Sequence, residues 1–453
     1  MATTPTTQKK KRVLSGMRPT GKLHIGHYFG ALENWVRLQN DATYDCFYFI
    51  ADWHALTSDY ADTSAVAQST IEIVTDYLAA GLDPQKSVIF QQSLIPEHAE
   101  LHLLLGMVTP LGWLERVPTY KEQIENVTSK DLHTYGFLGY PCLQTADIVM
   151  YSEPGTALFV PVGEDQVSHL ELSREIVRRF NLYYGLALNL QNAKSPADAK
   201  HMVQLKLAID RLEGKSGELK PGSEGIDMDE LESRLRRLAE SMGLANLQQK
   251  FAELEKTVAL GETAASKYKP FRDSIRFVDV LVEPQVQLTK TPRIPGLDGR
   301  KMSKSYGNTI TLAESDASIR AKTKVMVTDP ARKRRTDAGN PDVCPVYDWH
   351  KLFSTPETLE WSAEGCRTAG IGCIDCKARM ADHLIEWIAP IRERRVEYEK
   401  HPARVLEIVD QGSNRARTVA QGTMHRVREA VFGWQKKRAE IKAVSVAVHD
   451  THD

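Results

Sequence analysis

The chain has 453 residues, of which 42% are hydrophobic and 26% carry a charge, and these proportions are typical of a globular protein rather than a disordered one. No apolar run reaches the length that a membrane-spanning helix needs. The formal net charge of -1 argues against indiscriminate binding to nucleic acid, so any surface for RNA must come from local basic patches. Because a chain of this length exceeds one ordinary hydrophobic core, we expect two domains and an insertion.

The first twelve residues are polar and end in the basic run Lys9-Lys10-Lys11-Arg12. No apolar segment follows this run directly, so we expect neither a signal peptide nor a membrane anchor. Residues 1–12 are therefore predicted to form a disordered tail. The cytoplasm is the expected location of the protein, with no membrane partner.

Residues 13–27 predict a strand, a turn and the start of a helix. Two apolar residues begin the strand, a Pro-Thr-Gly turn follows, and apolar residues recur at helical spacing after Gly26. The first N–H groups of such a helix are unpaired and form a natural site for phosphate. His24 and His27 stand three residues apart and can face the same ligand, while Gly26 lets a flat ring lie close to the backbone. The alternative is that both histidines are ordinary surface residues.

Strands and helices alternate through the first part of the chain, residues 13–185. Residues 46–51 form an apolar strand, residues 64–80 a helix and residues 87–91 another strand. This order favours an α/β fold with a doubly wound, parallel, Rossmann-like sheet joined by right-handed crossovers. Ligands of such sheets bind at the carboxyl ends of the strands, and His54 closely follows one of these ends. His54 is therefore a candidate for the ligand site, and a structural histidine is the alternative.

A helix is expected to begin at Gly139-Tyr140-Pro141, since proline suits the first helical turn. Gln144, Asp147 and Ile148 share one face by their spacing, and that face is otherwise apolar. A carboxylate in a dry pocket is costly without a partner, and the indole N–H of tryptophan would supply one. The alternatives for Asp147 are a surface acid or a salt bridge in helix packing.

Residues 186–277 predict a helical insertion. Residues 211–225 hold five glycines and prolines and are expected to form a loop. Residues 228–242 and 247–260 carry apolar residues at helical spacing and are expected to pair as a helical hairpin, packed on the body or on a partner chain. We assign no chemistry to this segment.

Residues 299–305 read Gly-Arg-Lys-Met-Ser-Lys-Ser and lie in the second part of the expected catalytic domain, residues 278–318. Lys301 and Lys304 stand three residues apart in a glycine-flanked loop. Such a loop suits a mobile clamp that stabilises the charge developing on a departing pyrophosphate. A solvated basic loop is the alternative.

Residues 319–445 are predicted to form a helical domain that closes with a helix through Gly433, followed by a tail over residues 446–453. Because thiols stay reduced in the cytoplasm, a cysteine cluster in this domain indicates a metal site rather than disulfides. Zinc and an iron–sulfur cluster both accept four thiolates. The basic run at residues 332–335 and Lys377 are candidates for RNA contacts, although charge runs are usually solvated faces. Four of the six cysteines form the candidate metal site: Cys344, Cys366, Cys373 and Cys376.

The motifs His-Ile-Gly-His at residues 24–27 and Lys-Met-Ser-Lys-Ser at residues 301–305 together resemble the two signatures of the class I aminoacyl-tRNA synthetases. The runs SGMRPTGKLHIGHYFGALENW, VPVGEDQVSHLEL and DGRKMSKSYGN are similar to the tryptophanyl-tRNA synthetase family in particular. The likeness covers most of the chain outside the N-terminal tail and the central segment. A subset of bacterial members resembles this chain through GCRTAGIGCIDCK and carries a [4Fe–4S] cluster, so we prefer that cluster to zinc.

The resemblance implies ATP-dependent attachment of tryptophan to tRNA(Trp) through an adenylate, with Mg²⁺ screening the triphosphate. A homodimer is also implied, and the helical C-terminal domain is expected to read the anticodon. The residues implied to act in catalysis are His24, His27, Lys301 and Lys304. The implied ATP site comprises Arg18, Thr20, Gly26, His27, Gly163, Asp165, Lys301, Met302, Ser303 and Lys304. The implied tryptophan site comprises Leu14, Gly16, His54, Tyr140, Gln144, Asp147, Val160, Val162 and Gln166.

The residues alone leave two other functions open. The Gln-x-x-Asp pattern at Gln144 and Asp147 also suits the hydroxyl group of tyrosine, so a tyrosyl-tRNA synthetase is the first alternative. Leu14, which would form an apolar wall for a large ring, favours tryptophan. A non-catalytic RNA-binding paralogue with the same fold is the second alternative, and the intact histidine and lysine motifs argue against it.

Overall fold

The computed structural model describes residues 9–126, 130–188, 196–215, 227–259, 275–289 and 294–449. Its centre is a five-stranded sheet in the order β3-β2-β1-β4-β7, in which every neighbouring pair is parallel. The parallel α/β sheet predicted from the sequence is therefore confirmed. The strands are β1 (Lys11–Met17), β2 (Tyr44–Ile50), β3 (Ser87–Gln91), β4 (Leu158–Val162) and β7 (Pro284–Leu288).

The strand order reverses beside β1. From β1 the chain adds β2 and β3 on one side, and it later adds β4 and β7 on the other. The carboxyl ends of β1 and β4 therefore border the crevice in which doubly wound sheets bind ligands. Lys11 pairs with Tyr44 in the ladder, so the expected tail is wrong at its end, because Lys11 and Arg12 belong to β1. Residues 1–8 of that tail lie outside the described residues.

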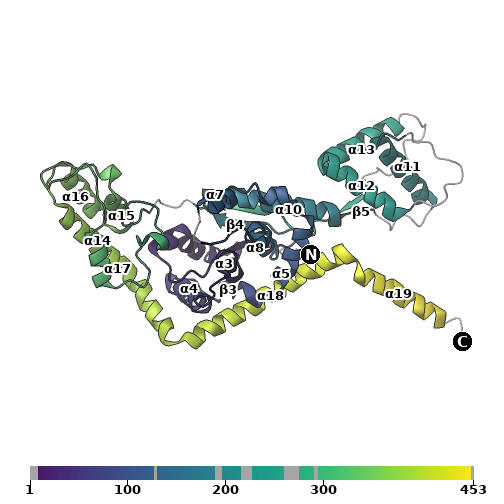
Figure 1. Ribbon diagram of the computed structural model, residues 1–453. Coiled ribbons are helices and arrows are strands. Elements are labelled where there is room, and N and C mark those ends of the chain that lie inside the picture. Colours follow the sequence, from purple (N-terminus) through teal and green to yellow (C-terminus); the bar gives the residue numbers. More distant parts are fainter. Residues whose placement is uncertain are drawn as a thin grey trace, which may run out of the picture.

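Helices cover both faces of the sheet (Figure 1). The helices predicted over residues 64–80 and from residue 140 are confirmed by α4 and α9. The helices of this part are α1 (Ile25–His27), α2 (Glu33–Gln39), α3 (Asp52–Asp59), α4 (Val66–Ala80), α5 (Glu97–Val108), α6 (Leu111–Leu114), α7 (Pro118–Asn126), α8 (Tyr135–Leu138), α9 (Tyr140–Val149) and α10 (Val167–Gly185).

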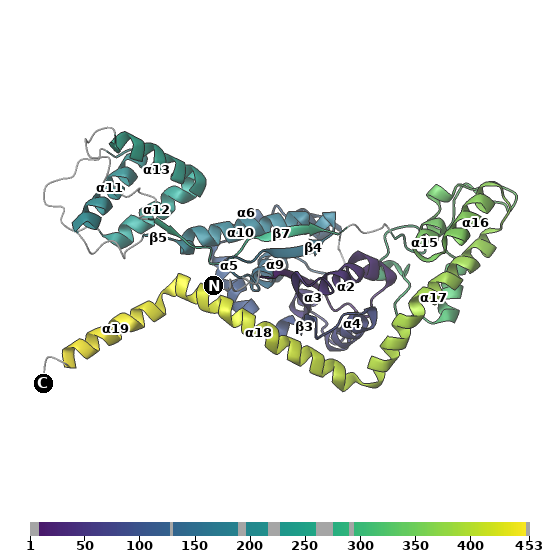
Figure 2. The ribbon, with the colours of Figure 1, turned by 180° about the vertical axis from the view of Figure 1, so that it is seen from behind.

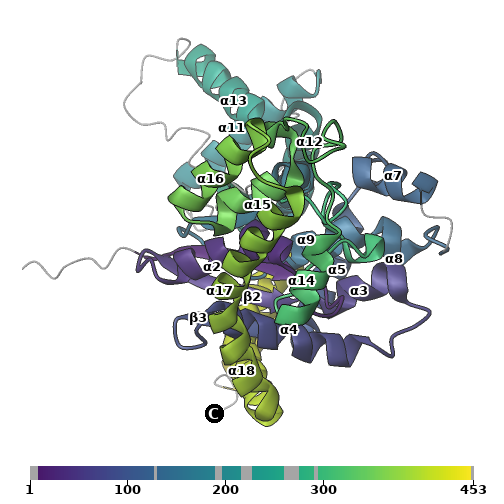
Figure 3. The same cartoon turned by 90° about the vertical axis from the view of Figure 1, so that its left-hand side faces the viewer.

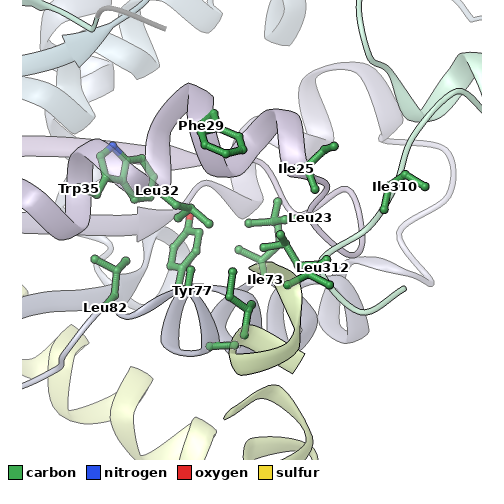
Figure 4. Packing of buried hydrophobic residues seen from close by; sticks show 14 of the residues in the cluster. Leu23, Ile25, Phe29, Leu32, Trp35, Ile73, Tyr77, Leu82, Ile310 and Leu312 are labelled. Carbon is green, nitrogen blue, oxygen red and sulfur yellow. The ribbon is translucent and has the colours of Figure 1, made fainter. Parts of the chain in front are cut away.

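The two faces of the sheet pack into different hydrophobic clusters, because successive side chains along a strand point to opposite faces. On β1, Val13 belongs to one cluster and Leu14 to the other. The cluster around Val13 includes Trp35 and Tyr77 from α2 and α4 (Figure 4). The cluster around Leu14 includes Phe49 and residues of α9 and α10. Both faces are covered, as is usual for parallel sheets, so only the edge at the strand ends is left for a ligand.

The described parts of residues 186–277 form a separate lobe at one end of the molecule (Figure 1). In its described part, β5 (Leu186–Leu188) pairs antiparallel with β6 (Ile275–Phe277) where the lobe joins α10. Its helices are α11 (Pro196–Leu212), α12 (Met228–Met242) and α13 (Leu244–Ala259), and they share a hydrophobic cluster of their own. The helices predicted over residues 228–242 and 247–260 correspond to α12 and α13, whereas α11 was not predicted.

Four helices form the opposite end of the molecule, which faces the viewer in Figure 3. They are α14 (Asp316–Lys324), α15 (Pro345–Phe353), α16 (Pro356–Arg367) and α17 (Cys373–Lys400). The next helix, α18 (Pro402–Phe432), turns back and runs along β3 (Figure 2). A Cβ atom on Gly412 of α18 would lie 1.8 Å from the carbonyl oxygen of Ile89, so glycine is required at this close approach. The helical C-terminal part is thus joined to the sheet through α18.

The expectation of a single closing helix through Gly433 is wrong. Gly433 adopts a left-handed conformation with φ of 60°, which ends α18, and α19 (Trp434–His449) follows. The predicted tail from residue 446 is also wrong at its start, since α19 continues to His449. Within the described residues, no helix combines the length and the apolar character needed to cross a lipid bilayer.

A buried ion pair joins α17 to the segment that precedes His24. Arg395 on α17 pairs with Asp76 on α4, and the second oxygen of Asp76 accepts the backbone N–H of Leu23 at 2.6 Å. Both side chains are buried. The pair therefore ties the helical C-terminal part to the loop that carries the histidine motif.

Replacing Arg395 with methionine should lower the free energy of unfolding by about 3–5 kcal/mol, because the substitution leaves the carboxylate of Asp76 buried without an ionic partner. Urea denaturation followed by circular dichroism measures this loss. Arg320→Met is the matched control, since the ion pair of Arg320 with Asp382 is exposed and should contribute less than about 1 kcal/mol. Equal losses for the two variants would contradict the structural role of the buried pair.

Candidate active site

A cavity of about 460 Å³ opens at the carboxyl ends of β1 and β4, where the strand order reverses. Its walls come mainly from β1, α3, α9, β4 and the turn after β4. The fold therefore brings residues from separate parts of the chain to one site. All nine residues of the amino-acid site implied by the sequence line this cavity: Leu14, Gly16, His54, Tyr140, Gln144, Asp147, Val160, Val162 and Gln166.

The carboxylate of Asp147 lies in the wall of this cavity and is 1% exposed. Gln92 Nε2 donates to both carboxylate oxygens at 2.8 Å, His98 Nδ1 lies 2.6 Å from Oδ1, and His54 Nε2 lies 2.9 Å from Oδ2. Burial by itself would raise the pKa of Asp147, but the hydrogen bonds from His54 and His98 lower it to about 2. The expectation that the substrate supplies the partner of this acid is therefore corrected, because the protein already supplies three.

The remaining wall suits a flat apolar ring. Leu14 is buried in β1, and Gly16 stands beside Phe49, where a Cβ atom would lie 2.6 Å from the phenyl ring. Glycine at this position lets the phenyl ring lie against β1. Tyr140 Oη and Thr119 Oγ1 lie 2.7 Å apart in the cavity wall, so the hydroxyl of Tyr140 already has a hydrogen-bond partner.

His24 and His27 lie at the start of the helix that follows β1. Their ring centroids are 3.6 Å apart, and the backbone N–H of His24 donates to His27 Nδ1 at 3.2 Å. Burial and the ammonium group of Lys304 lower the pKa of His24 to about 4, and burial together with His24 and Lys304 lowers the pKa of His27. Both imidazoles are therefore neutral near pH 7 and can bind phosphate as N–H donors, not as cations. Nδ1 of His24 is buried and has no partner among the described residues.

The lysine loop, residues 299–305, contacts the histidine motif, residues 24–27, and the turn before it. Lys304 Nζ donates to the carbonyl oxygens of Thr20 and Gly21, both at 2.8 Å. A Cβ atom on Gly26 would lie 2.9 Å from His24 Nδ1, so this glycine lets the imidazole of His24 lie against the backbone. Met302 Sδ lies beside the same position, 3.4 Å from where that Cβ atom would be. Two backbone hydrogen bonds, from Ile25 to Ile310 and from Leu312 to Leu23, continue the contact, and these four side chains lie together in Figure 4. The two motifs, nearly three hundred positions apart, therefore meet.

Nine of the ten implied ATP residues divide into three groups. Arg18 and Gly163 line the cavity. Thr20, Gly26, His27, Met302 and Lys304 form the contact between the two motifs. Lys301 is exposed. Ser303 lies between Lys301 and Lys304 in the loop, and its backbone N–H donates to Asn308 Oδ1 at 2.8 Å. The backbone of Asp165 lies in the turn Glu164–Gln166, and its side chain lies outside the described part of the structure.

Sequence reasoning missed three residues of this site. Gln92 and His98 bind Asp147, but they lie on other elements and follow no motif that the sequence displays. Asn308 is buried and donates to Asp298 Oδ1 at 2.7 Å and to the Lys301 carbonyl at 3.1 Å, so it braces the lysine loop. The run DGRKMSKSYGN contained Asn308, and a buried amide in a polar loop is the signal that could have identified it.

The four predicted cysteines lie near one another at the α14–α17 end. Cys344 caps α15, Cys366 lies in the last turn of α16, and Cys373 and Cys376 lie in the first turn of α17. Burial raises the pKa of Cys376 to about 12, with contributions from the other three thiols. Among the described residues, no three or more side chains of His, Cys, Asp or Glu are gathered closely enough to hold a metal ion.

Arg332 does not belong to a solvated basic face, as the sequence suggested for residues 332–335. Its side chain is buried, its Nη1 lies 3.8 Å from Cys366 Sγ, and its Nη2 donates to the carbonyl oxygen of Ile371 at 2.7 Å. The ammonium group of Lys377 donates to the carbonyl of Lys324 at 3.1 Å. The residues of the run that are exposed are Lys333, Arg334 and Arg335.

Comparisons of this chain with a family model and with individual known proteins agree on one family. The model described as class I tRNA synthetases (W and Y) matches residues 6–206 and 255–388, more than half of the chain. The tryptophan–tRNA ligase of Ralstonia nicotianae is 48% identical over 423 residues, which are 93% of this chain and 98% of that protein. The tryptophan–tRNA ligase of Thermotoga maritima is 41% identical over 421 residues, with 93% and 98% covered.

A solved structure agrees with these relatives. Tryptophanyl-tRNA synthetase from Campylobacter jejuni, complexed with ADP and tryptophan, has a TM-score of 0.63 at 25% identity and covers 93% of this chain and 99% of that chain. In this chain the two motifs meet beside a parallel sheet of the kind that the sequence predicts. The chain therefore belongs to the tryptophan–tRNA ligases, a family of class I aminoacyl-tRNA synthetases.

Proposed function

We propose that this chain attaches L-tryptophan to tRNA(Trp) with ATP, through a tryptophanyl-adenylate. The observation that carries the proposal is the ionised, buried Asp147 in a cavity that lies beside two motifs in mutual contact. The carboxylate of tryptophan attacks the α-phosphate of ATP, pyrophosphate leaves, and a ribose hydroxyl at the 3′ end of the tRNA takes the acyl group. Positioning and charge stabilisation supply most of the catalysis in such chemistry.

In this proposal the cavity holds the amino acid. The indole N–H donates to Asp147, Leu14, Val160 and Val162 form the apolar wall, and Gln166 lies near the amino group. A site that is built to accept one donor rejects rings that lack it, because the acceptor then loses a partner. The other lining residues of the proposed tryptophan site are Gly16, His54, Tyr140 and Gln144.

The nucleotide is proposed to lie between the two motifs. His24 and His27 donate N–H groups to the triphosphate, and Lys304 and Lys301 stabilise the leaving pyrophosphate. The adenosine portion is proposed to contact Arg18, Thr20, Gly26, Gly163, Asp165, Met302 and Ser303. Because the described residues contain no preassembled group of carboxylates, Mg²⁺ would be bound largely by the phosphates of ATP.

The tRNA is proposed to reach the α14–α17 end, where Lys333, Arg334 and Arg335 are exposed cations for phosphate contacts.

A homodimer is proposed on the face formed by α5 and α6, where Leu103, Met107 and Leu111 are exposed. Analytical ultracentrifugation measures this association, and a mass of one chain at micromolar concentration would refute it.

ATP–pyrophosphate exchange with each of the twenty amino acids tests the proposed function. Tryptophan should stimulate exchange, and the enzyme should then charge tRNA(Trp) with labelled tryptophan. Stimulation by tyrosine and not by tryptophan would identify the tyrosine alternative. Exchange with no amino acid, alongside binding of tRNA, would identify a non-catalytic RNA-binding paralogue.

We further propose that Cys344, Cys366, Cys373 and Cys376 hold a [4Fe–4S] cluster. The donor set fits, because four neighbouring thiols come from the ends of three helices and the buried guanidinium of Arg332 lies beside Cys366. Buried cations need an anionic partner, and a thiolate cluster is one. Zinc sites usually contain two Cys-x-x-Cys pairs, and this sequence contains only the pair Cys373 and Cys376, which favours the cluster over zinc. When bound, the cluster would cross-link α15, α16 and α17.

Anaerobic purification should yield a brown protein with about four iron and four sulfide per chain. Cys373→Ser should lose the iron and lower the melting temperature, because three helix ends lose their cross-link. Cys142→Ser is the matched control, since Cys142 is a buried cysteine of α9, and it should retain the iron. A colourless protein with one zinc per chain would contradict the cluster.

A further inference from the structure

A buried chain of hydrogen bonds lies behind Asp147, on the side away from the cavity. His98, in the first turn of α5, is 0% exposed, and its Nδ1 lies 2.6 Å from Asp147 Oδ1. Its Nε2 lies 2.8 Å from the hydroxyl oxygen of Tyr151, which is also buried. Neither His98 nor Tyr151 lines the cavity. The three residues form a buried chain, from hydroxyl to imidazole to carboxylate.

The carboxylate of Asp147, at one end of this chain, determines the direction of its hydrogen bonds. A carboxylate can only accept, so the proton on His98 must be on Nδ1 and point to Asp147. Nε2 of the neutral ring is then an acceptor, and the hydroxyl of Tyr151 must donate to it. Burial, Asp147 and Glu97 raise the pKa of Tyr151, so this hydroxyl keeps its proton. Every polar atom of the chain is satisfied in one arrangement, which fixes the tautomer of His98.

Other donors to Asp147 do not replace His98. Gln92 Nε2 is shared between both oxygens, and His54 lines the cavity, where a bound ring would lie against it. Gln92 is buried as well and donates from the same side, but His98 is the buried donor whose N–H is directed at one oxygen of Asp147 alone.

We propose that His98 is a positioning and specificity-determining residue, which holds Asp147 as an acceptor-only carboxylate so that the cavity selects a substrate ring presenting an N–H donor. This inference rests on the proposed function, since it assumes that the ring of tryptophan binds at Asp147. Without the donor at Nδ1, Asp147 would be more easily protonated, and a protonated acid presents a donor where the substrate needs an acceptor. The groups that face Asp147 are His54 on α3, Gln92 after β3, and His98 and His102 on α5.

Two substitutions of His98 separate positioning from packing. The amide nitrogen of His98→Asn can take the place of Nδ1 and donate to Asp147, whereas that of His98→Gln can take the place of Nε2 and cannot. In tryptophan-dependent ATP–pyrophosphate exchange, His98→Gln should raise KM for tryptophan at least tenfold, leave KM for ATP within twofold, and lose affinity at a higher pH than the wild type does as the pH is lowered. KM for tryptophan in His98→Asn should stay within about threefold of the wild-type value. His102→Gln, on the next turn of α5, is the control and should also stay within threefold, since no hydrogen bond from His102 to Asp147 occurs in the described residues.

Equal and pH-independent losses in His98→Gln and His98→Asn, or an equal rise in KM for ATP, would overturn the proposal and indicate a packing role. Nitrogen-15 NMR of histidine-labelled wild-type protein gives a readout that needs no variant and no activity. It should show a proton on Nδ1 of His98; a ring protonated at Nε2 alone would overturn the proposal. If the wild type shows no tryptophan-dependent exchange while the NMR result holds, the proposed function fails and the hydrogen-bonded chain stands.

Discussion

Replacing Asp147 with asparagine should raise KM for tryptophan about 100-fold in ATP–pyrophosphate exchange, with KM for ATP almost unchanged. The substitution removes the charged acceptor, and a hydrogen bond to a charged group contributes about 1.5–3 kcal/mol. The new amide would also direct an N–H₂ group toward Gln92, His98 or the substrate, all of which are donors. Asp382→Asn, on the exposed face of α17, is the matched control and should leave both constants unchanged. A wild-type KM in Asp147→Asn would show that the ring of the substrate binds elsewhere.

The same carboxylate has a consequence for acid stability. Its pKa in the folded protein, about 2, lies below its ordinary value. Ionised Asp147 therefore stabilises the folded state above about pH 4, and this contribution is lost as the pH falls from about 4 to about 2. The acid-unfolding curve of Asp147→Asn should accordingly be flatter than that of the wild type in this range.

Replacing Lys304 with methionine should lower kcat for adenylate formation about 100-fold to 1000-fold, and KM for tryptophan should change little. Removing one preorganised donor from a developing negative charge costs about this much. Lys304 holds the carbonyl oxygens of Thr20 and Gly21, so the ammonium group is already placed beside the histidine motif. Burial lowers the pKa of Lys304, but its amino group still donates hydrogen bonds.

Lys351→Met is the control for this substitution. Lys351 forms an exposed ion pair with Asp348, so its replacement should leave kcat unchanged. Lys301→Met should have a smaller effect on kcat than Lys304→Met, since Lys301 is exposed. Undiminished adenylate formation in Lys304→Met would show that the lysine loop does not stabilise the leaving pyrophosphate.

The fold was predictable where side-chain periodicity reports burial. The apolar runs of β2 and β3 and the leucine spacing of α12 identified these elements with ends close to those observed. Lys11 and Arg12 were assigned to a tail because they are charged, but Arg12 forms an ion pair with Asp45 across the ladder, and this contact depends on the neighbouring strand. The end of α18 at Gly433 was not predicted, because a glycine within a helical pattern does not by itself show that its backbone is left-handed.

The site was predictable where one motif carried several of its residues. His24, Gly26 and His27 form one such motif. His98 could not be predicted, because its role depends on α5 packing against α9, which brings it to Asp147 from 49 positions away. Arg332 was misassigned for the converse reason, since a basic run does not reveal which of its members turns inward.

One cavity and two contacting motifs should bind tryptophan and ATP together. A crystal structure of the protein with tryptophan and a non-hydrolysable ATP analogue would show whether they do. We expect the indole nitrogen within hydrogen-bonding distance of an Asp147 oxygen, and the triphosphate between the imidazoles of His24 and His27 and the ammonium group of Lys304. An indole ring turned away from Asp147, or a triphosphate bound outside the two motifs, would contradict this expectation.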